Sequence, residues 1–334
     1  MVPVCLVSVF QTQVTQVQAQ DKNAYSIVIH GGAGGDPGRW SAEYQQQRRE
    51  SLGAALEVGI EMLEDGKSAI DVVEAVVRTM EDDPVFNAGR GCVLNEEGDH
   101  ELDASIMDGA TLRCGAVAAV TSAKHPVTLA RKVMENTRHV LLMGSGADKF
   151  GKQIGVEQAP ADWFVTDRKK ASWKRWKAGQ QDAMLHRPKN LGPGEEQLYL
   201  GTVGCVALDS QGNIAAATST GGLMGKRWGR VGDSPIVGAG NYADNATCGV
   251  SGTGVGEEFI RIGVARDIAA RMEYGGQSLE QAAAATVGKL PEDAGGVIAI
   301  DKHGNIATPF NTPGMSRAMA NSSGLKSVAL GREE

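Results

Sequence analysis

The chain has 334 residues, a formal net charge of −7 and 44 glycines. The acidic charge argues against a nucleic-acid binder, because phosphate affinity depends on clustered Lys and Arg side chains. No stretch of the sequence reaches the roughly 18 to 20 apolar residues that a membrane span requires, and the five cysteines show no C-x-x-C pair and no metal-type spacing with histidine. We therefore expect a globular protein without nucleic-acid or membrane partners, rich in tight turns that use glycine.

The first 22 residues differ from the rest of the chain. A short apolar run, MVPVCLVSVF, is followed by the polar run QTQVTQVQAQ, in which Val17 and Ala19 have the spacing of a signal-peptidase site. The basic region that precedes the apolar run of a secretory signal is missing. Residues 1–22 are interpreted as a signal-like or disordered leader outside the fold. We expect a periplasmic or secreted protein, with a cytoplasmic location as the alternative.

The first half of the remaining chain mixes strands and helices. Residues 24–35, AYSIVIHGGAGG, predict a buried strand that runs into a glycine-rich turn. Apolar side chains at helical spacing predict two helices, residues 42–64 and 68–80, that cover a sheet. Between residues 91 and 120 the apolar period changes to two, which predicts three short antiparallel strands. The next predicted elements are a helix, a strand and a second helix, over residues 126–136, 139–144 and 146–155.

Residues 155–200 have the composition of a long linker. They contain Pro160, Pro188 and Pro193 and show little sustained apolar periodicity. A connection of this length inside a compact domain is usually functional or disordered. Its basic stretch RKKASWKRWK, residues 168–177, could bind RNA, but the chain is acidic and carries no recognition motif. We therefore interpret this stretch as a solvated amphipathic helix.

Regular structure returns directly after the linker. Two hairpins are predicted around DSQGN, residues 209–213, and DKHGN, residues 301–305, where a glycine with positive φ closes the turn. Between them, apolar periodicity predicts helices over residues 256–272 and 278–290. The order of the elements predicts an α+β fold, in which two stacked, mainly antiparallel sheets are covered by helices on both outer faces.

Candidate catalytic groups are concentrated in the second half of the chain. The familiar motifs G-x-S-x-G, H-E-x-x-H and the Walker loop are missing, and His30 alone is more typical of a core histidine than of a catalytic one. Threonines, glycines, an arginine and an aspartate recur in GTVG, ATSTGG, GRVGDSP and SGTGVGEE. A threonine hydroxyl needs a base, and an α-amino group with a pKa of about 7.7 to 8.0 is suitable at neutral pH. That base requires Thr202 to become the first residue of a new chain.

Seven motifs in the chain resemble one family in their order and spacing. They are HGGAGG, FNAGRG, HELDASIMDG, GTVGCVALD, ATSTGG, GRVGDSP and GTGVGEEFIR. The family is the plant-type L-asparaginases and isoaspartyl peptidases, a group of N-terminal nucleophile hydrolases, and the resemblance covers residues 26–315 apart from the linker. It implies a four-layer αββα sandwich whose precursor cuts itself between Gly201 and Thr202. The resulting α subunit, residues 23–201, and β subunit, residues 202–334, would form one catalytic domain.

The resemblance also implies roles for individual residues. Thr202 matches the nucleophile, and Thr220 matches the hydroxyl that hydrogen-bonds to the nucleophile and tunes it. Asn87 matches a residue that positions the nucleophile from the first subunit. Thr253 and Gly254 match an oxyanion hole, where a hydroxyl and a backbone N–H meet developing negative charge.

The implied substrate-binding residues overlap with this set. Arg230 and Asp233 match a clamp on the free α-carboxylate and α-ammonium of the substrate, which suits an arginine fork and a carboxylate chemically. Gly256 joins them, together with Thr253 and Gly254. We expect hydrolysis of L-asparagine and of isoaspartyl (β-aspartyl) dipeptides to L-aspartate.

Further expectations follow from the same resemblance. No cofactor is required for the chemistry, and the implied assembly is a dimer of cleaved heterodimers. A structural sodium ion is implied in a loop, held by backbone carbonyls of Glu81, Asp83, Phe86, Ala88 and Arg90. The chain departs from the family at the cysteine of GCVALD, at Gly252 and in its N-terminal extension.

Two alternative functions remain open on the sequence. A glycosylasparaginase shares the fold and the nucleophile, but that branch typically shows HDTIG at the cleavage site, whereas this chain shows YLGTVG. A protein of another class, an uncleaved and non-catalytic binding protein, could retain the same fold. The intact threonines and the complete clamp argue against it.

Overall fold

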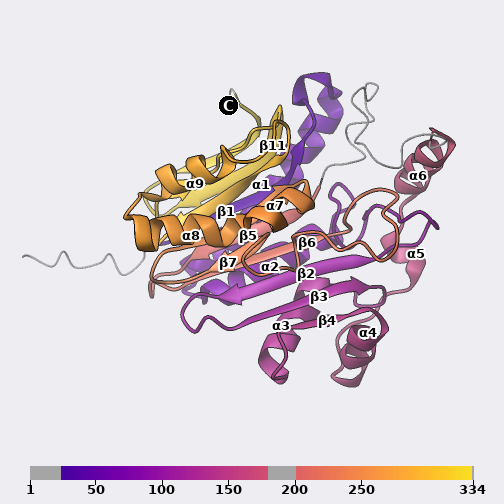
Figure 1. Cartoon of the computed structure of the whole chain (residues 1–334), viewed down its shortest axis with the longest axis horizontal. Coiled ribbons are helices and arrows are strands. Elements are labelled where there is room, and N and C mark those ends of the chain that lie inside the picture. The colour runs from indigo at the N-terminus through magenta and orange to yellow at the C-terminus, as the bar shows by residue number, and fades with distance from the viewer. Residues whose placement is uncertain (1–23, 180–200, 333–334) are drawn as a thin grey trace, which may run out of the picture.

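Two β-sheets stack face to face at the centre of the molecule. The computed structural model describes residues 24–179 and 201–332, and in this part of the chain helices cover the outer face of each sheet (Figure 1). The predicted αββα arrangement is therefore confirmed. The leader, residues 1–22, lies outside the described residues, as does the part of the linker over residues 180–200. None of the described helices combines the length and the apolar character that crossing a bilayer takes.

Eight of the described strands form the larger sheet. Their order is β12 (Lys326–Gly331), β11 (Gly314–Asn321), β1 (Ser26–Gly34), β5 (Val203–Leu208), β6 (Ile214–Thr220), β2 (Leu102–Asp108), β3 (Cys114–Val120) and β4 (Leu141–Met143). Neighbours pair antiparallel except β3 and β4, which are parallel because a helix crosses over between them. The register of β1 and β5 pairs His30 with Gly204, so the glycine-rich turn after β1 lies beside the start of β5.

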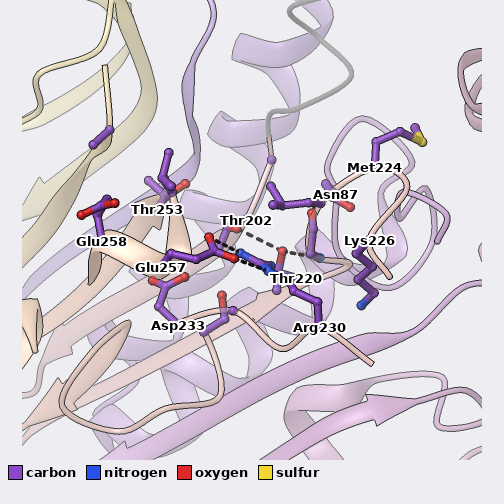
Figure 2. Close-up of a pocket in the computed structure, with 18 of the residues that line it drawn as sticks. Asn87, Thr202, Thr220, Met224, Lys226, Arg230, Asp233, Thr253, Glu257 and Glu258 are labelled. Carbon is purple, nitrogen blue, oxygen red and sulfur yellow. Dashed lines mark hydrogen bonds and ion pairs between the residues drawn. The ribbon is translucent and has the colours of Figure 1, made fainter. Parts of the chain in front are cut away.

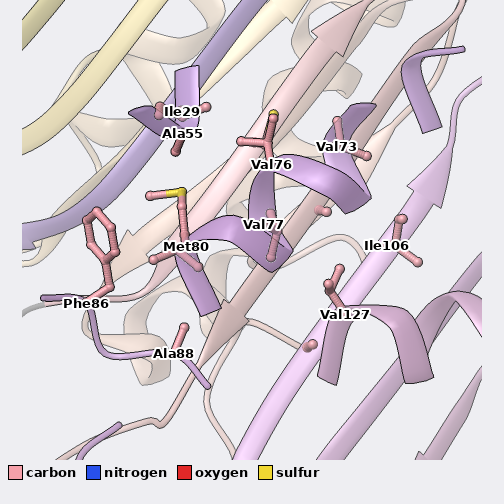
Figure 3. Close-up of a cluster of buried hydrophobic side chains, with 14 of the residues drawn as sticks. Ile29, Ala55, Val73, Val76, Val77, Met80, Phe86, Ala88, Ile106 and Val127 are labelled. Atoms are coloured by element: carbon pink, nitrogen blue, oxygen red, sulfur yellow. The ribbon is translucent and has the colours of Figure 1, made fainter. Parts of the chain in front are cut away.

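Four of the described helices pack on the outer face of the larger sheet: α1 (Ala42–Glu64), α2 (Ala69–Asp82), α3 (Pro126–Asn136) and α4 (Gly144–Gln153). Helix α1 begins at the predicted residue and α2 one residue later, because Ser41 and Ser68 cap them through their side chains. Valines of α2 pack with Ile29 and Phe86 in one apolar core between helices and sheet (Figure 3). Full burial of one such side chain is worth roughly 1.5–3 kcal/mol.

The smaller sheet has four of the described strands. Its order is β10 (Ile306–Ala307), β9 (Gly295–Asp301), β8 (Cys248–Gly254) and β7 (Asn241–Ala243). Helices α8 (Val264–Gly275) and α9 (Leu279–Val287) cover its outer face (Figure 1). The remaining described helices are α5 (Ala161–Phe164), α6 (Asp167–Gly179), α7 (Gly256–Ile262) and a 3₁₀ turn (Pro37–Arg39).

The period of two in the central strands decides which side chains enter the space between the sheets. In β5, Cys205 belongs to the core under the helices and Val206 to the core between the sheets. In β6, Ala216 faces the space between the sheets. By the same alternation, Thr202 and Thr220 share this inner face. Cys205, one departure from the family, packs as a small apolar side chain.

The strand prediction for residues 91–120 is wrong in one element. The structure has two strands there, β2 and β3, and residues 92–97 form an irregular loop. The Val93 amide donates to Asn87 Oδ1, and the Leu94 carbonyl accepts from the Gly225 amide. These backbone groups pair with other loops, so the segment makes no ladder although its apolar side chains alternate.

Two helix predictions also need correction. The helix predicted over residues 256–272 is divided into α7 and α8 by Gly263, whose φ of +66° ends the first helix.

The basic stretch of the linker is helical as predicted, in α6, but one face of it packs against the fold. Lys169 and Ser172 are buried, and Trp173 Nε1 donates to the Asn95 carbonyl at 2.8 Å. The interpretation of a solvated helix is wrong for this face.

Candidate active site

Two threonine hydroxyls meet at one end of the space between the sheets (Figure 2). Thr202 precedes β5 and Thr220 ends β6, and their Oγ1 atoms lie 3.0 Å apart. The Gly222 backbone N–H donates to Thr220 Oγ1 at 3.0 Å. Thr220 can therefore direct its own hydrogen at Thr202 Oγ1 and stabilise negative charge that develops there.

The carbonyl between the two predicted subunits has its own hydrogen-bond donor. The Asn87 backbone amide donates to the Gly201 carbonyl oxygen at 3.0 Å. The Asn87 side chain holds the neighbouring loop, because its Nδ2 donates to the Gly222 carbonyl at 2.9 Å. Asn87 thus contacts the Gly201–Thr202 segment through its backbone, and its predicted role in positioning the nucleophile stays a prediction.

Gly32 and Gly201 touch backbone to backbone beside this carbonyl. Gly32 has a φ of +121° and Gly201 a φ of +139°, and a Cβ on Gly32 would lie 2.6 Å from the Gly201 nitrogen. Neither position tolerates a side chain without movement of the chain at the predicted cleavage site.

Replacing Gly32 with alanine is expected to slow cleavage of the precursor about a hundredfold, as displacement of reacting atoms by about 1 Å typically does. The half-life of the uncut chain after purification measures this effect. The control is Gly53→Ala in α1, where a Cβ meets nothing within 4 Å. Equal cleavage rates in the two variants would show that the close approach does not position the scissile bond.

A buried histidine holds the backbone of Thr202. His30 Nδ1 lies 3.0 Å from the Thr202 carbonyl oxygen and Nε2 lies 2.9 Å from Ser251 Oγ. A carbonyl only accepts, so Nδ1 carries the hydrogen and Nε2 accepts from Ser251. Burial lowers the pKa of His30 to about 3. The ring is therefore a neutral support for the Thr202 peptide and too weak a base to deprotonate its hydroxyl at neutral pH.

Thr253 and Gly254 end strand β8 in the wall of the same cavity as Thr202. The Ala33 amide donates to Thr253 Oγ1 at 3.1 Å. This contact uses an acceptor position of the hydroxyl and leaves its hydrogen for a second partner. The pair can therefore offer a hydroxyl donor to an oxygen that becomes negatively charged near Thr202.

Arg230 pairs with Glu257, a residue outside the predicted clamp. Its Nε donates to Glu257 Oε1 at 2.9 Å and its Nη2 to Oε2 at 3.0 Å. The hydrogen bond from Arg230 lowers the pKa of Glu257, so the carboxylate stays ionised. This two-point contact fixes the plane of the guanidinium and leaves further N–H groups for a ligand carboxylate. The sequence signal for this contact is Glu257 itself, an acidic residue in the first turn of α7.

Asp233 lies beside Arg230 as a buried carboxylate (Figure 2). Among the described residues, no group hydrogen-bonds to its Oδ2 atom. Burial raises the pKa of Asp233 to about 7, although the nearby charge of Arg230 acts in the opposite direction. A buried acceptor without a donor is rare in folded proteins and suits an incoming ammonium group.

Two glycines allow close packing around these charged groups. A Cβ on Gly256 would lie 2.8 Å from Arg230 Nη2 and 2.9 Å from Asp233 Oδ1. Gly256 therefore lies directly behind the clamp. A Cβ on Gly252 would lie 2.7 Å from the ring of Phe259. The departure from the family at Gly252 is thus matched by an aromatic ring that fills the adjacent space.

The predicted site residues border one cavity of about 580 Å³. Those in its wall are Asn87, Gly201, Thr202, Thr220, Arg230, Asp233, Thr253 and Gly254. The volume falls within the roughly 300–1,000 Å³ of typical small-molecule sites. The fold thus brings together residues from β6, β8 and three loops that are far apart in the sequence.

The loop of the predicted sodium ion is compact. The Glu81 carbonyl accepts from the Arg90 amide at 2.7 Å, and the Asp83 carbonyl accepts from the Phe86 amide at 3.2 Å. Each carbonyl keeps a second lone pair, and carbonyl oxygens are suitable ligands for an alkali ion. The loop therefore offers carbonyl oxygens of the type that such an ion binds, and the ion stays a prediction.

Comparison with known sequences identifies the family. The sequence model of a family described as "Asparaginase" matches residues 23–330. The chain belongs to the asparaginase family. An isoaspartyl peptidase of Escherichia coli (strain K12) is 47% identical over 313 residues, which cover 92% of this chain and 96% of that relative. A probable isoaspartyl peptidase/L-asparaginase 2 of Arabidopsis thaliana is 42% identical over 322 residues, covering 92% and 98%. An isoaspartyl peptidase/L-asparaginase of Mus musculus is 42% identical over 292 residues, covering 86% of each chain.

Proposed function

We propose that this asparaginase-family protein is an amidohydrolase that frees Thr202 by cutting its own chain and then hydrolyses isoaspartyl dipeptides and L-asparagine to L-aspartate. The observation that carries the proposal is the position of Thr202 Oγ1, 3.0 Å from Thr220 Oγ1 in the cavity that Arg230 and Asp233 border. Relatives named isoaspartyl peptidase and isoaspartyl peptidase/L-asparaginase support the substrate class.

Self-cleavage starts from the uncut chain. Thr202 Oγ1 attacks the Gly201 carbonyl carbon, the C–O bond forms as the C–N bond to Thr202 breaks, and the hydroxyl proton ends on the Thr202 nitrogen. Water then hydrolyses the ester and leaves a Gly201 carboxylate and a free Thr202 amine. The Asn87 N–H, 3.0 Å from the Gly201 oxygen, stabilises the charge that gathers on this oxygen.

Substrate hydrolysis uses the new amine as the base. The amine takes the proton of Thr202 Oγ1, which attacks the side-chain carbonyl carbon of the aspartyl head. Arg230 and Asp233 hold its α-carboxylate and α-ammonium, while Thr253 and Gly254 meet the oxyanion. The amine then gives its proton to the leaving nitrogen, so ammonia or an amino acid departs. Water hydrolyses the acyl-enzyme by the same base and releases aspartate.

Three further features belong to the proposal. We infer a dimer of cleaved heterodimers and a periplasmic or secreted location, supported by the family resemblance and by the apolar leader respectively. The sodium ion would bind the carbonyls of residues 81–90 and fix the loop that carries Asn87. The ion would have a structural role only.

Substrate choice separates the proposal from a glycosylasparaginase. The purified protein is expected to release aspartate from an isoaspartyl dipeptide with a kcat/KM at least about tenfold above that for N4-(β-N-acetylglucosaminyl)-L-asparagine. Aspartate release under initial-rate conditions measures both. The reverse order would favour the glycosylasparaginase, and no release from any substrate would favour a non-catalytic binding protein.

A further inference from the structure

The cavity is larger than the aspartyl head that the clamp would hold. We propose that Trp228 and Trp176 form an aromatic wall on the leaving-group side of the cavity, which makes isoaspartyl dipeptides with a large apolar or aromatic second residue better substrates than L-asparagine. This inference rests on the proposed function and specifies which substrate the same site prefers.

The position of the leaving group follows from the arrangement around Thr202. Thr253 and Glu258 lie on one side of Thr202, and Met224 and Lys226 lie on the other (Figure 2). The second side belongs to residues 222–229, which we call the rim loop. A substrate held at the clamp, with its amide at Thr202, has the rim-loop side of the cavity left for its leaving group.

Trp228 has an unusual conformation for a tryptophan in this loop. It is 87% exposed and has a φ of +56°, a region that bulky residues rarely adopt. Neither burial nor backbone preference accounts for a tryptophan here, yet Trp228 borders the cavity. Strained backbone and an exposed aromatic ring at a cavity are together typical of a binding position.

Trp176 reaches the same wall from helix α6. Its ring lies so close to the rim loop that a Cβ on Gly225 would lie 1.9 Å from Trp176 Cζ2. Trp176 borders the cavity, whereas Trp173 on the same face of α6 packs against the turn at Gly98 and lies outside the cavity wall. Of these two tryptophans, only the one beside the cavity is therefore placed to meet a substrate.

The additional cationic side chains of the wall already have acidic partners. Lys226, Arg227 and Arg261 border the cavity, and they pair with Glu101, Glu96 and Glu258 respectively. The proposed preference therefore depends on the two tryptophans.

The test compares substrates within each variant. Trp228→Gly is chosen because glycine adopts a φ of +56° without strain, so the variant is expected to keep the melting temperature of the wild type. It is expected to lower the ratio of kcat/KM for β-aspartyl-phenylalanine to that for L-asparagine about tenfold, as loss of an aromatic contact does. Trp176→Leu is expected to lower the same ratio, and the control Trp173→Leu is expected to keep it.

The outcomes are distinguishable. An unchanged ratio in Trp228→Gly and Trp176→Leu would overturn the inference and leave the proposed function intact. An equal fall in kcat/KM for both substrates would also overturn the inference, because the tryptophans would then have a structural role. A wild-type protein that hydrolyses neither substrate would contradict the proposed function itself.

Discussion

With alanine at position 202, the protein is expected to remain one uncut chain and to lose hydrolysis of isoaspartyl dipeptides by about 10⁴-fold or more, as enzymes do without their nucleophile. The variant lacks the oxygen that attacks both the Gly201 carbonyl and the substrate. Thr220, the clamp and the oxyanion donors remain in place. Gel electrophoresis under denaturing conditions and aspartate release measure the two effects.

Two controls define the result at this position. Thr202→Ser keeps the hydroxyl and is expected to retain cleavage and activity within about a hundredfold. Thr79→Ala removes a hydroxyl that donates to the Ala75 carbonyl within α2 and is expected to behave as the wild type. An alanine variant at position 202 that is still cut after Gly201 would contradict the assignment of the nucleophile.

Replacing Asp233 with asparagine is expected to raise KM for isoaspartyl dipeptides about a hundredfold, because the substrate ammonium loses its buried counter-charge. The effect on kcat is expected to be smaller, since both ground state and transition state use the clamp. Steady-state kinetics separates the two constants. Glu258→Gln, which also removes a carboxylate from the cavity wall, is the control and is expected to change KM by less than about threefold. An unchanged KM for L-asparagine in Arg230→Ala would contradict the whole clamp.

The pKa of Asp233 gives this prediction a pH dependence. Burial raises that pKa to about 7, and only the ionised form attracts an ammonium group. KM of the wild type is therefore expected to rise as the pH falls below about 7, and KM of Asp233→Asn is expected to stay flat. The Thr202 amine also titrates near neutral pH, but its protonation lowers kcat in both proteins.

The same shift predicts an effect on stability. The folded state raises the pKa of Asp233 above its ordinary value, so the unfolding free energy is highest below about pH 4 and falls as the pH rises from there to about 7, where the folded-state carboxyl ionises. At pH 8, Asp233→Asn is expected to gain on the order of 2 kcal/mol in the free energy of unfolding. A lower melting temperature than that of the wild type at pH 8 would contradict the burial of Asp233 Oδ2 without a hydrogen-bond donor.

Much of the fold is predictable because its signals are local. Apolar spacing, capping serines and turn glycines act over a few residues, and they place α1, α2 and both hairpins correctly. The errors lie where tertiary contacts decide. Residues 92–97 alternate like a strand, but their amides and carbonyls pair with distant loops, and α6 buries Lys169 against the fold although its sequence is among the most basic in the chain.

The site was predictable only as a set of residue types. The family motifs named the residues that border the cavity, but motif order does not reveal distances. Two contacts of the site join segments more than 25 residues apart in the sequence. One is the pairing of Arg230 with Glu257, and the other is the support of Thr202 by His30 and Ser251. The contact between Trp176 and the rim loop joins the linker to the cavity in the same way. Such contacts become visible only when the sheets are stacked.

The most direct test of self-cleavage at Thr202 is the intact mass of the purified wild-type protein, combined with N-terminal sequencing. Cleavage after Gly201 predicts two fragments of about 21 kDa and about 14 kDa, less any leader that has been removed, and the smaller one begins at Thr202. A single chain of 35.0 kDa that persists through prolonged incubation would contradict the proposed mechanism, because its base would never be formed.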